Sequence, residues 1–263
     1  MDKSSVFGLI LGILAIGVGM YLKGVSPSAL LNPAAILIIL AGTIAAVCIA
    51  FPLNELKRVP KLLRIIFGKD EKESLLDVIH LFSELAVIAR RDGLLALEAK
   101  LTEVEDPFLK SGLTLAIDGQ APEYIRDVLE EEIDAMQERH SSGALIFSQA
   151  GTYAPTLGVL GAVIGLIAAL GNLKNTDLLG HAIAAAFVAT LMGIFTGYVL
   201  WHPFANKLKR KSQGEIKRKE IMIEGILSIL EGQPPRLIES KLAVYLPIKE
   251  RSLIISTGEK LDE

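Results

Sequence analysis

Threonine hydroxyls supply most of the polar chemistry available inside the long apolar runs of this sequence. They belong to Thr43, Thr152, Thr156, Thr190 and Thr196. A hydroxyl can line a hydrated ion path, although on a helix it usually donates to a carbonyl of its own backbone. Thr190 stands in an otherwise alanine-rich stretch, which makes it the best candidate for lining such a path.

Ionisable side chains are missing where an ion path would need one. No Asp, Glu, Lys or Arg occupies the central part of any apolar run, and such residues mark proton relays in membranes. If protons cross the membrane here, another chain must supply the carboxylate that titrates. His181 and His202 lie at opposite edges of the last run. An interfacial, non-catalytic role is expected for both, and either could titrate near neutrality.

A charged segment outside the apolar runs could bind a protein partner. The stretch ARRDGLLALE at residues 89–98 carries Arg90, Arg91 and Glu98, with leucines between them. Opposite charges at the rim of an interface set orientation and association rate more than affinity. The alternative is that Arg90 and Glu98 serve only ion pairs within the fold.

Four helices that cross a bilayer are expected to position these groups. The composition is 51% hydrophobic with a mean hydropathy of +0.46, which is too apolar for an ordinary soluble domain. A membrane span needs about 20 helical residues, and four runs are long enough: 4–22, 33–52, part of 141–173, and 179–201. The first run is long for a signal peptide and lacks a clear cleavage site. The fold class is therefore all-α, an integral membrane protein with a cytoplasmic helical domain.

The loops predict the orientation. The segments after the second and fourth runs, NELKRVPKLLR and NKLKRKSQGEIKRK, are basic, whereas the links within each pair of runs are nearly neutral. Positive loops stay in the cytoplasm, so both termini and the long middle segment are predicted to be cytoplasmic. The predicted segments are a first span pair (1–52), a cytoplasmic helical domain (53–147), a second span pair (148–202) and C-terminal cytoplasmic helices (203–263).

Small residues and prolines predict local features of the helices. Gly161 and Gly165 form a small-xxx-small pattern that lets membrane helices approach closely. Pro155 removes a backbone donor and is expected to kink or loosen the third span. In the cytoplasmic segments, helices are expected to break at Gly93 and at Gly119, to restart near Pro122, and to end before Pro235.

Several classes of function are disfavoured. Cys48 is the only cysteine, so no disulfide or cysteine metal cluster is expected. The net charge of −3 gives no basic field for nucleic acid. No catalytic motif or histidine cluster is present, so neither an enzyme nor a bound cofactor or metal is expected.

The whole chain resembles the MotA family of flagellar-motor stator subunits, within the MotA/TolQ/ExbB proton channel family. The resemblance is carried by MYLKGVSPSALLNPAAILIILAGT, ARRDGLLALE, GTYAPTLGVLGAVIGLIAAL, HAIAAAFVATLMGIFTGYVLWHPFANKLKRKS and ILEGQPPRLIE, and it is nearest to the Bacillus and Clostridium type. It implies a ring of five copies in the bacterial plasma membrane. The ring would surround a dimer of a MotB-like partner that brings one span, a membrane aspartate and a peptidoglycan-binding domain, and it would turn the rotor protein FliG.

The resemblance also assigns roles to single residues. It implies rotor contact for Arg90, Arg91 and Glu98. It implies roles in the ion path or torque coupling for Pro155, Thr190 and Pro235. Sodium-driven relatives carry further threonines where this chain has Ala162 and Ala189. The loss of two oxygen ligands favours protons over sodium as the coupling ion.

Three other functions are consistent with parts of the pattern. An energiser of the ExbB/TolQ type would have three spans and an external N-terminus. A transporter with its own substrate site would be expected to show buried charge, broken-helix pairs and repeated halves. A scaffold without an ion path would tolerate changes at Thr190 and Pro155.

Overall fold

A computed structural model describes residues 3–68, 75–171, 175–248 and 250–251. The described residues are helical or lie in short connections, with no strand among them, which confirms the all-α prediction. The chain divides into two compact units, Met1–Asp70 with Arg139–Lys211 and Glu71–Glu138 with Ser212–Glu263. We call these the membrane unit and the head unit. The predicted four-segment division depends on where the bilayer lies, and it stays a prediction.

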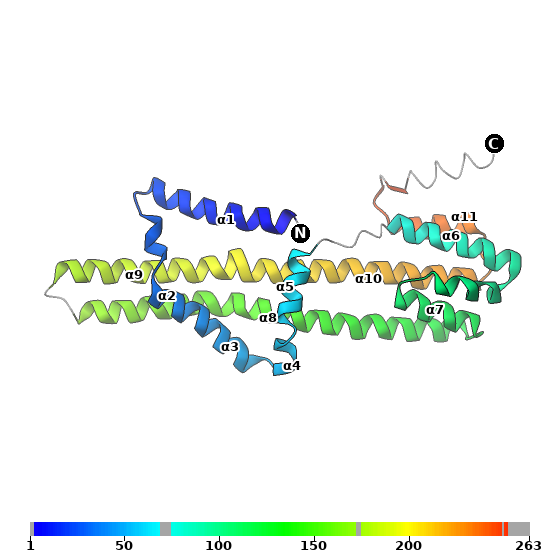
Figure 1. The fold of residues 1–263 in the computed structure, drawn as a ribbon, viewed down its shortest axis with the longest axis horizontal. Helices are drawn as coiled ribbons and strands as arrows, with labels where there is room; N and C mark the ends of the chain where they lie inside the picture. Colours follow the sequence, from blue (N-terminus) through cyan, green and yellow to red (C-terminus); the bar gives the residue numbers. More distant parts are fainter. Residues whose placement is uncertain (1–2, 69–74, 172–174, 249, 252–263) are drawn as a thin grey trace. The chain divides into compact units, whose positions relative to one another are not determined.

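Among the described residues, four helices are long and apolar enough to cross a membrane, as the sequence predicted (Figure 1). The first is α1 (Lys3–Leu22), followed by a short η1 (Pro27–Leu30). The second consists of α2 (Pro33–Ile36), the π-helical η2 (Leu37–Ala41) and α3 (Gly42–Ala50). Asn32 accepts hydrogen bonds from the first free N–H groups of α2, and Pro33 at the first position leaves no donor to satisfy.

The third and fourth spans are parts of much longer helices. The third belongs to α8 (Pro122–Leu170), which runs unbroken for 49 residues. The fourth comprises α9 (Thr176–Phe195), the π-helical η4 (Thr196–Trp201) and α10 (His202–Leu230). Pro155 does not interrupt α8.

The wide turn at η4 follows from Pro203, an effect that the sequence analysis did not anticipate. Proline has no N–H, and its ring would collide with the carbonyl four residues earlier in a regular α-helix, here that of Val199. The helix widens instead, and His202 donates its N–H to the carbonyl of Gly197, five residues back. Such π-helical turns frequently lie at functional sites.

Short helices follow the second span within the membrane unit. They are α4 (Leu53–Leu56) and α5 (Val59–Phe67). The apolar side of α5 buries Ile66 against Phe147 and Phe204, and the rings of Phe67 and Phe204 meet edge to face at 5.4 Å. The hydroxyl of Ser142 on α8 donates to Glu55, so α4 is also fixed to α8.

The head unit is built from α6 (Leu75–Asp92), η3 (Leu94–Thr102), α7 (Pro107–Ile117), the first part of α8, the end of α10, and α11 (Pro235–Ala243). The predicted breaks at Gly93 and Gly119 coincide with glycines in the left-handed region, with φ of 87° and 74°. The helix α10 ends at Leu230, before Pro235 as predicted, and Gly232 (φ 67°) lies in the turn that follows. A helix resumes after Gly93, but it is the 3-10 helix η3 and not an α-helix.

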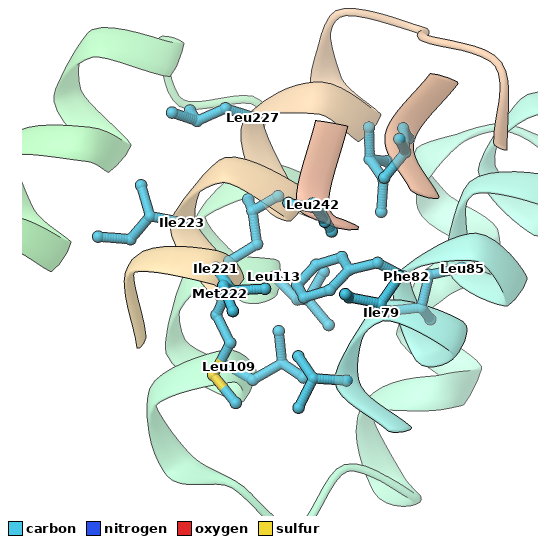
Figure 2. Packing of buried hydrophobic residues seen from close by; sticks show 14 of the residues in the cluster. Ile79, Phe82, Leu85, Leu109, Leu113, Ile221, Met222, Ile223, Leu227 and Leu242 are labelled. Carbon is cyan, nitrogen blue, oxygen red and sulfur yellow. The ribbon is translucent and has the colours of Figure 1, made fainter. Parts of the chain in front are cut away.

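A continuous apolar core holds the head unit together. Figure 2 shows Phe82 of α6 pointing toward Leu113 of α7 and Leu242 of α11, beside Ile221 and Met222 of α10. Phe82 and Leu113 are fully buried. Gly225 allows the ring of Phe82 to lie against the backbone of α10, because a methyl group at Gly225 would lie only 2.5 Å from Cδ1 of that ring.

Glu224 connects three helices of the head unit through charge. Its carboxylate accepts from Arg126 of α8 at 2.9 Å and from Lys241 of α11 at 2.9 Å. Lys241 also donates to the hydroxyl of Ser228, a fully buried residue. Burial alone would raise the pKa of Glu224, but the hydrogen bonds from Lys241 and Arg126 outweigh it, so the pKa lies below the ordinary glutamate value.

Replacing Glu224 with glutamine is expected to destabilise the head unit and to remove part of its sensitivity to acid. A lowered pKa means that the carboxylate contributes stability above the ordinary glutamate pKa, and that this contribution is lost as pH falls through the lowered value. The loss at neutral pH is expected to be about 1–2 kcal/mol, since Arg126 and Lys241 keep contact with water. Thermal unfolding of the purified chain from pH 7 to pH 3 measures both effects. Parallel pH profiles for the native chain and the variant would contradict this account.

Candidate functional site

The third and fourth spans pack so closely at glycines that the backbone of one helix contacts the backbone of the other. A methyl group at Gly193 of α9 would lie 2.7 Å from the carbonyl oxygen of Ala154 and 2.8 Å from Cα of Gly158, both on α8. A methyl group at Gly158 would lie 2.9 Å from the carbonyl oxygen of Ala189 and 2.9 Å from Cα of Gly193. Only glycine fits on either side, which is how small residues bring membrane helices together.

The predicted packing glycines lie further along the same contact. Methyl groups at Gly161 and Gly165 would each meet an alanine Cβ of α9 at 3.3 Å, that of Ala189 and that of Ala186, respectively. These two glycines therefore face α9, but with more room than Gly158 and Gly193. The closest contact, between Gly158 and Gly193, was not predicted, because the prediction considered only the GxxxG pattern of Gly161 and Gly165 within one helix. Comparing the glycine spacings of α8 and α9 would have found it.

Pro155 lies against the π-helical turn of the fourth span. A methyl group at Gly197 would lie 2.8 Å from Cγ of Pro155 and 2.8 Å from the carbonyl oxygen of Gly151. The Gly151 carbonyl is the one that residue 155 would bond in a regular helix, and proline cannot donate to it. Pro155 thus frees a carbonyl at the point where η4 passes, and the glycine at 197 lets the two backbones approach there.

The hydroxyl of Thr190 lies on a flank of α9 and is half-buried. It donates to the carbonyl of Ala186 at 3.4 Å, a long and weak bond. The structure also describes Ala162 and Ala189, the two alanines on which the expectation of protons as the coupling ion rests. Ala189 is buried against α8, and Ala162 of α8 is half-buried.

The two edge histidines have different surroundings. His181 is exposed on α9. The ring of His202 lies 5.3 Å from that of Tyr198 and covers Gly151, where a methyl group would come within 2.9 Å of three ring atoms. His202 therefore fills space beside the carbonyl that Pro155 frees.

The charged stretch of the head unit presents two unpaired charges. Arg91 binds its neighbour Asp92 through two nitrogens, the shorter contact being 2.8 Å, and this hydrogen bond lowers the pKa of Asp92. Arg90 and Glu98 are exposed, and neither has an ion pair with any residue that the structure describes. The alternative that Arg90 and Glu98 serve only as ion-pair partners within the fold is therefore not supported by the structure.

Arg90 borders a small open cavity of about 240 Å³ in the head unit. The cavity lies between the end of α6 and the turn after α10, and its lining includes Gly93, Ile229, Gly232 and Gln233. Pro235, at the first position of α11, follows this turn directly. Arg90 and the segment leading to Pro235 are thus neighbours, which their separation in the sequence does not reveal. No three His, Cys, Asp or Glu side chains among the described residues are grouped as metal ligands would be.

Similarity to known proteins extends over nearly the whole chain. The profile of the MotA/TolQ/ExbB proton channel family matches residues 100–221. Motility protein A of Bacillus subtilis (strain 168) is 64% identical over 259 residues, which cover 98% of this chain and 96% of that protein. The structure of the flagellar MotAB stator complex from Bacillus subtilis matches with a TM-score of 0.91 at 65% identity, covering 95% of this chain and 98% of that one. The C. jejuni MotAB structure matches with a TM-score of 0.90 at 34% identity, over 94% of this chain and 97% of that one.

Proposed function

Since this chain belongs to the MotA/TolQ/ExbB proton channel family, we propose that it is a stator subunit of the bacterial flagellar motor. With a MotB-type partner it forms an ion channel and converts ion flow into torque. The observation that carries the proposal is the near-complete alignment with Motility protein A and with a chain of a MotAB stator complex. This is a family of channels and not a class of enzymes. The chain accordingly spans the bacterial plasma membrane several times, with both termini proposed to be cytoplasmic.

The partner supplies what the spans of this chain lack. No acidic or basic side chain stands in the middle of any span, so a MotB-type subunit brings the aspartate that titrates. A charge is costly inside a bilayer, and each protonation therefore favours a different packing against the third and fourth spans. Large apolar side chains are exposed there for such packing, among them Val159 and Ile164 of α8 and Phe187 of α9. Repeated steps turn a ring of this chain around a partner anchored to peptidoglycan.

Complementation tests the function directly. Expression of this chain with its partner in a non-motile strain without stators is expected to restore swimming. Purification in mild detergent is expected to recover a single-span protein with a membrane aspartate and a peptidoglycan-binding domain. Recovery of a short single-span partner without that domain would indicate an energiser of the ExbB/TolQ type instead, and failure to recover any single-span partner would rule out ion-driven torque.

The proposed coupling ion is the proton. Sodium needs several oxygen ligands once it sheds water, and Ala162 and Ala189 offer none from their side chains. Swimming speed is therefore expected to stay constant when potassium replaces sodium at fixed pH, and to fall to zero when a protonophore is added. A speed that rises and saturates with sodium concentration would show that other oxygens bind that ion.

The proposed rotor contact is made by Arg90 and Glu98. Their exposure and lack of partners within the fold leave both charges available to FliG. Reversal of both charges, Arg90→Glu with Glu98→Lys, is expected to abolish torque while leaving membrane assembly intact. A second pair of reversals on the rotor helix is expected to restore it. The matched control is Lys110→Glu, an exposed charge on a different helix, α7, and unchanged swimming with both reversals in place would disprove the contact.

A further inference from the structure

Thr43 differs from the other threonines of the spans. The hydroxyls of Thr152, Thr156, Thr190 and Thr196 each donate to a carbonyl of their own helix. Thr43 is only 2% exposed, and its Oγ1 has no hydrogen-bond partner among the residues that the structure describes. A buried polar atom without a partner is unfavourable, so something else must complete its bonding.

The side chain of Trp201 also lacks a hydrogen-bond partner within the described part of the chain, in this case an acceptor. Its indole Nε1 is also buried without a hydrogen-bond partner among the described residues. An indole nitrogen can only donate a hydrogen bond, whereas a threonine hydroxyl can donate and accept. The two groups have complementary bonding capacity and lie in the same unit, so one partner between them can complete the bonding of both.

Both side chains reach the same level of α8. Ile39, Thr43 and Val47 lie at four-residue spacing and therefore on one face of the second span. Ile39 shares a buried cluster with Ala154, and Val47 shares one with Ala150. Trp201 packs against both clusters. Thr43 therefore lies between Ile39 and Val47, and Trp201 packs against the clusters that contain these two residues.

The backbone nearby offers a third polar group. Thr43 comes just after η2, and Trp201 is the last residue of η4. Because His202 donates to Gly197 and Pro203 has no N–H, the carbonyl of Tyr198 lacks the helical donor it would otherwise have. This carbonyl is three residues from Trp201, within one turn.

We propose that one buried water molecule is bound between the second and fourth spans by Thr43 and Trp201. The water accepts the indole N–H of Trp201 and hydrogen-bonds with the hydroxyl of Thr43, and it donates its remaining proton to a backbone carbonyl of the π-helical turn. Three polar partners are typical of a buried water in proteins. The two side chains form no direct hydrogen bond, which is the circumstance in which a bridging water is expected.

Trp201 provides its own reporter, because it is the single tryptophan of the chain. Ultraviolet resonance Raman spectra of the full-length chain in detergent micelles report whether its indole N–H is hydrogen-bonded. We expect a bonded indole in the native chain and in Thr43→Ser, and a weakened bond in Thr43→Val. The matched control is Thr152→Val, since Thr152 bonds its own helix, and it is expected to leave the spectrum unchanged. An unbonded indole in the native chain, or identical spectra for native and Thr43→Val, would overturn the proposal.

A second measurement tests for the water itself. Brief X-ray radiolysis in ¹⁸O-labelled water oxidises side chains that touch water. Trp201 is half-buried at the end of its span, and it is expected to take up more label in the intact chain than in Thr43→Val, which loses a ligand of the bound water. If Trp201 takes up no label while exposed tyrosines such as Tyr124 are labelled, no water is bound there and the proposal fails.

Discussion

Gly193→Val is expected to separate the third and fourth spans and to abolish assembly of a functional stator. The added side chain would point at the carbonyl of Ala154 and at Cα of Gly158, and neither backbone atom can move aside as a side chain could. Overpacking of a close contact costs about 1–3 kcal/mol and sometimes more. We expect the upper end, about 3 kcal/mol, because backbone lies on the opposing side. Thermal unfolding in detergent and the yield of the complex with its partner measure the effect.

A glycine on the same helix gives the control for this prediction. Gly180 is exposed and no atom lies within 4 Å of a methyl group built there. Gly180→Val is therefore expected to leave assembly and swimming close to native. Equal behaviour of Gly193→Val and Gly180→Val would mean that the spans do not pack at backbone distance in the membrane.

Phe82→Ala is expected to loosen the whole head unit. Phe82 is fully buried among α6, α7, α10 and α11 (Figure 2), and its ring rests on the backbone at Gly225. Removing a buried phenylalanine side chain costs about 3–5 kcal/mol through lost burial and the cavity that remains. Hydrogen–deuterium exchange of the amides of α6 is expected to accelerate by about two to three and a half orders of magnitude, at about 1.4 kcal/mol per tenfold change.

The same helix supplies a control for Phe82. Val87 is about half exposed on α6, so Val87→Ala removes apolar atoms without opening a cavity. Its exchange rates are expected to stay within a few-fold of native, since surface changes cost about 0.5 kcal/mol at most. If Phe82→Ala accelerated exchange no more than Val87→Ala, the head unit would not depend on this core.

The spans and the breaks between helices could be predicted from the sequence because each depends on local signals. Apolar runs of about 20 residues have few alternatives to a membrane helix. Positive φ values at Gly93, Gly119 and Gly232 fall where glycine marks the end of a helix. The head core follows from apolar residues at helical spacing, such as Ile79, Phe82 and Ala86 on α6.

Features without a distinct signal in the local sequence could not be predicted in this way. The 3-10 geometry of η3 is not distinguished from an α-helix by its leucines alone. The π-helical turn requires Pro203 to be recognised as lying inside a continuing helix, and the predicted span ended before it. Arg90 and Arg91 are adjacent in the sequence, yet only Arg91 is paired with a neighbour. The roles of Pro155, Thr190 and Pro235 remain predictions from the family resemblance.

The glycine contact between the third and fourth spans has a consequence for the entropy of assembly. Most interfaces require side chains to give up rotamers when they pack, and each long side chain so fixed costs about 0.5–1.5 kcal/mol. Gly158 and Gly193 have no rotamers to lose, and the facing Ala154 and Ala189 have almost none. These two spans can therefore associate soon after insertion with little ordering of side chains, and the pair so formed gives the other two spans a rigid surface on which to pack.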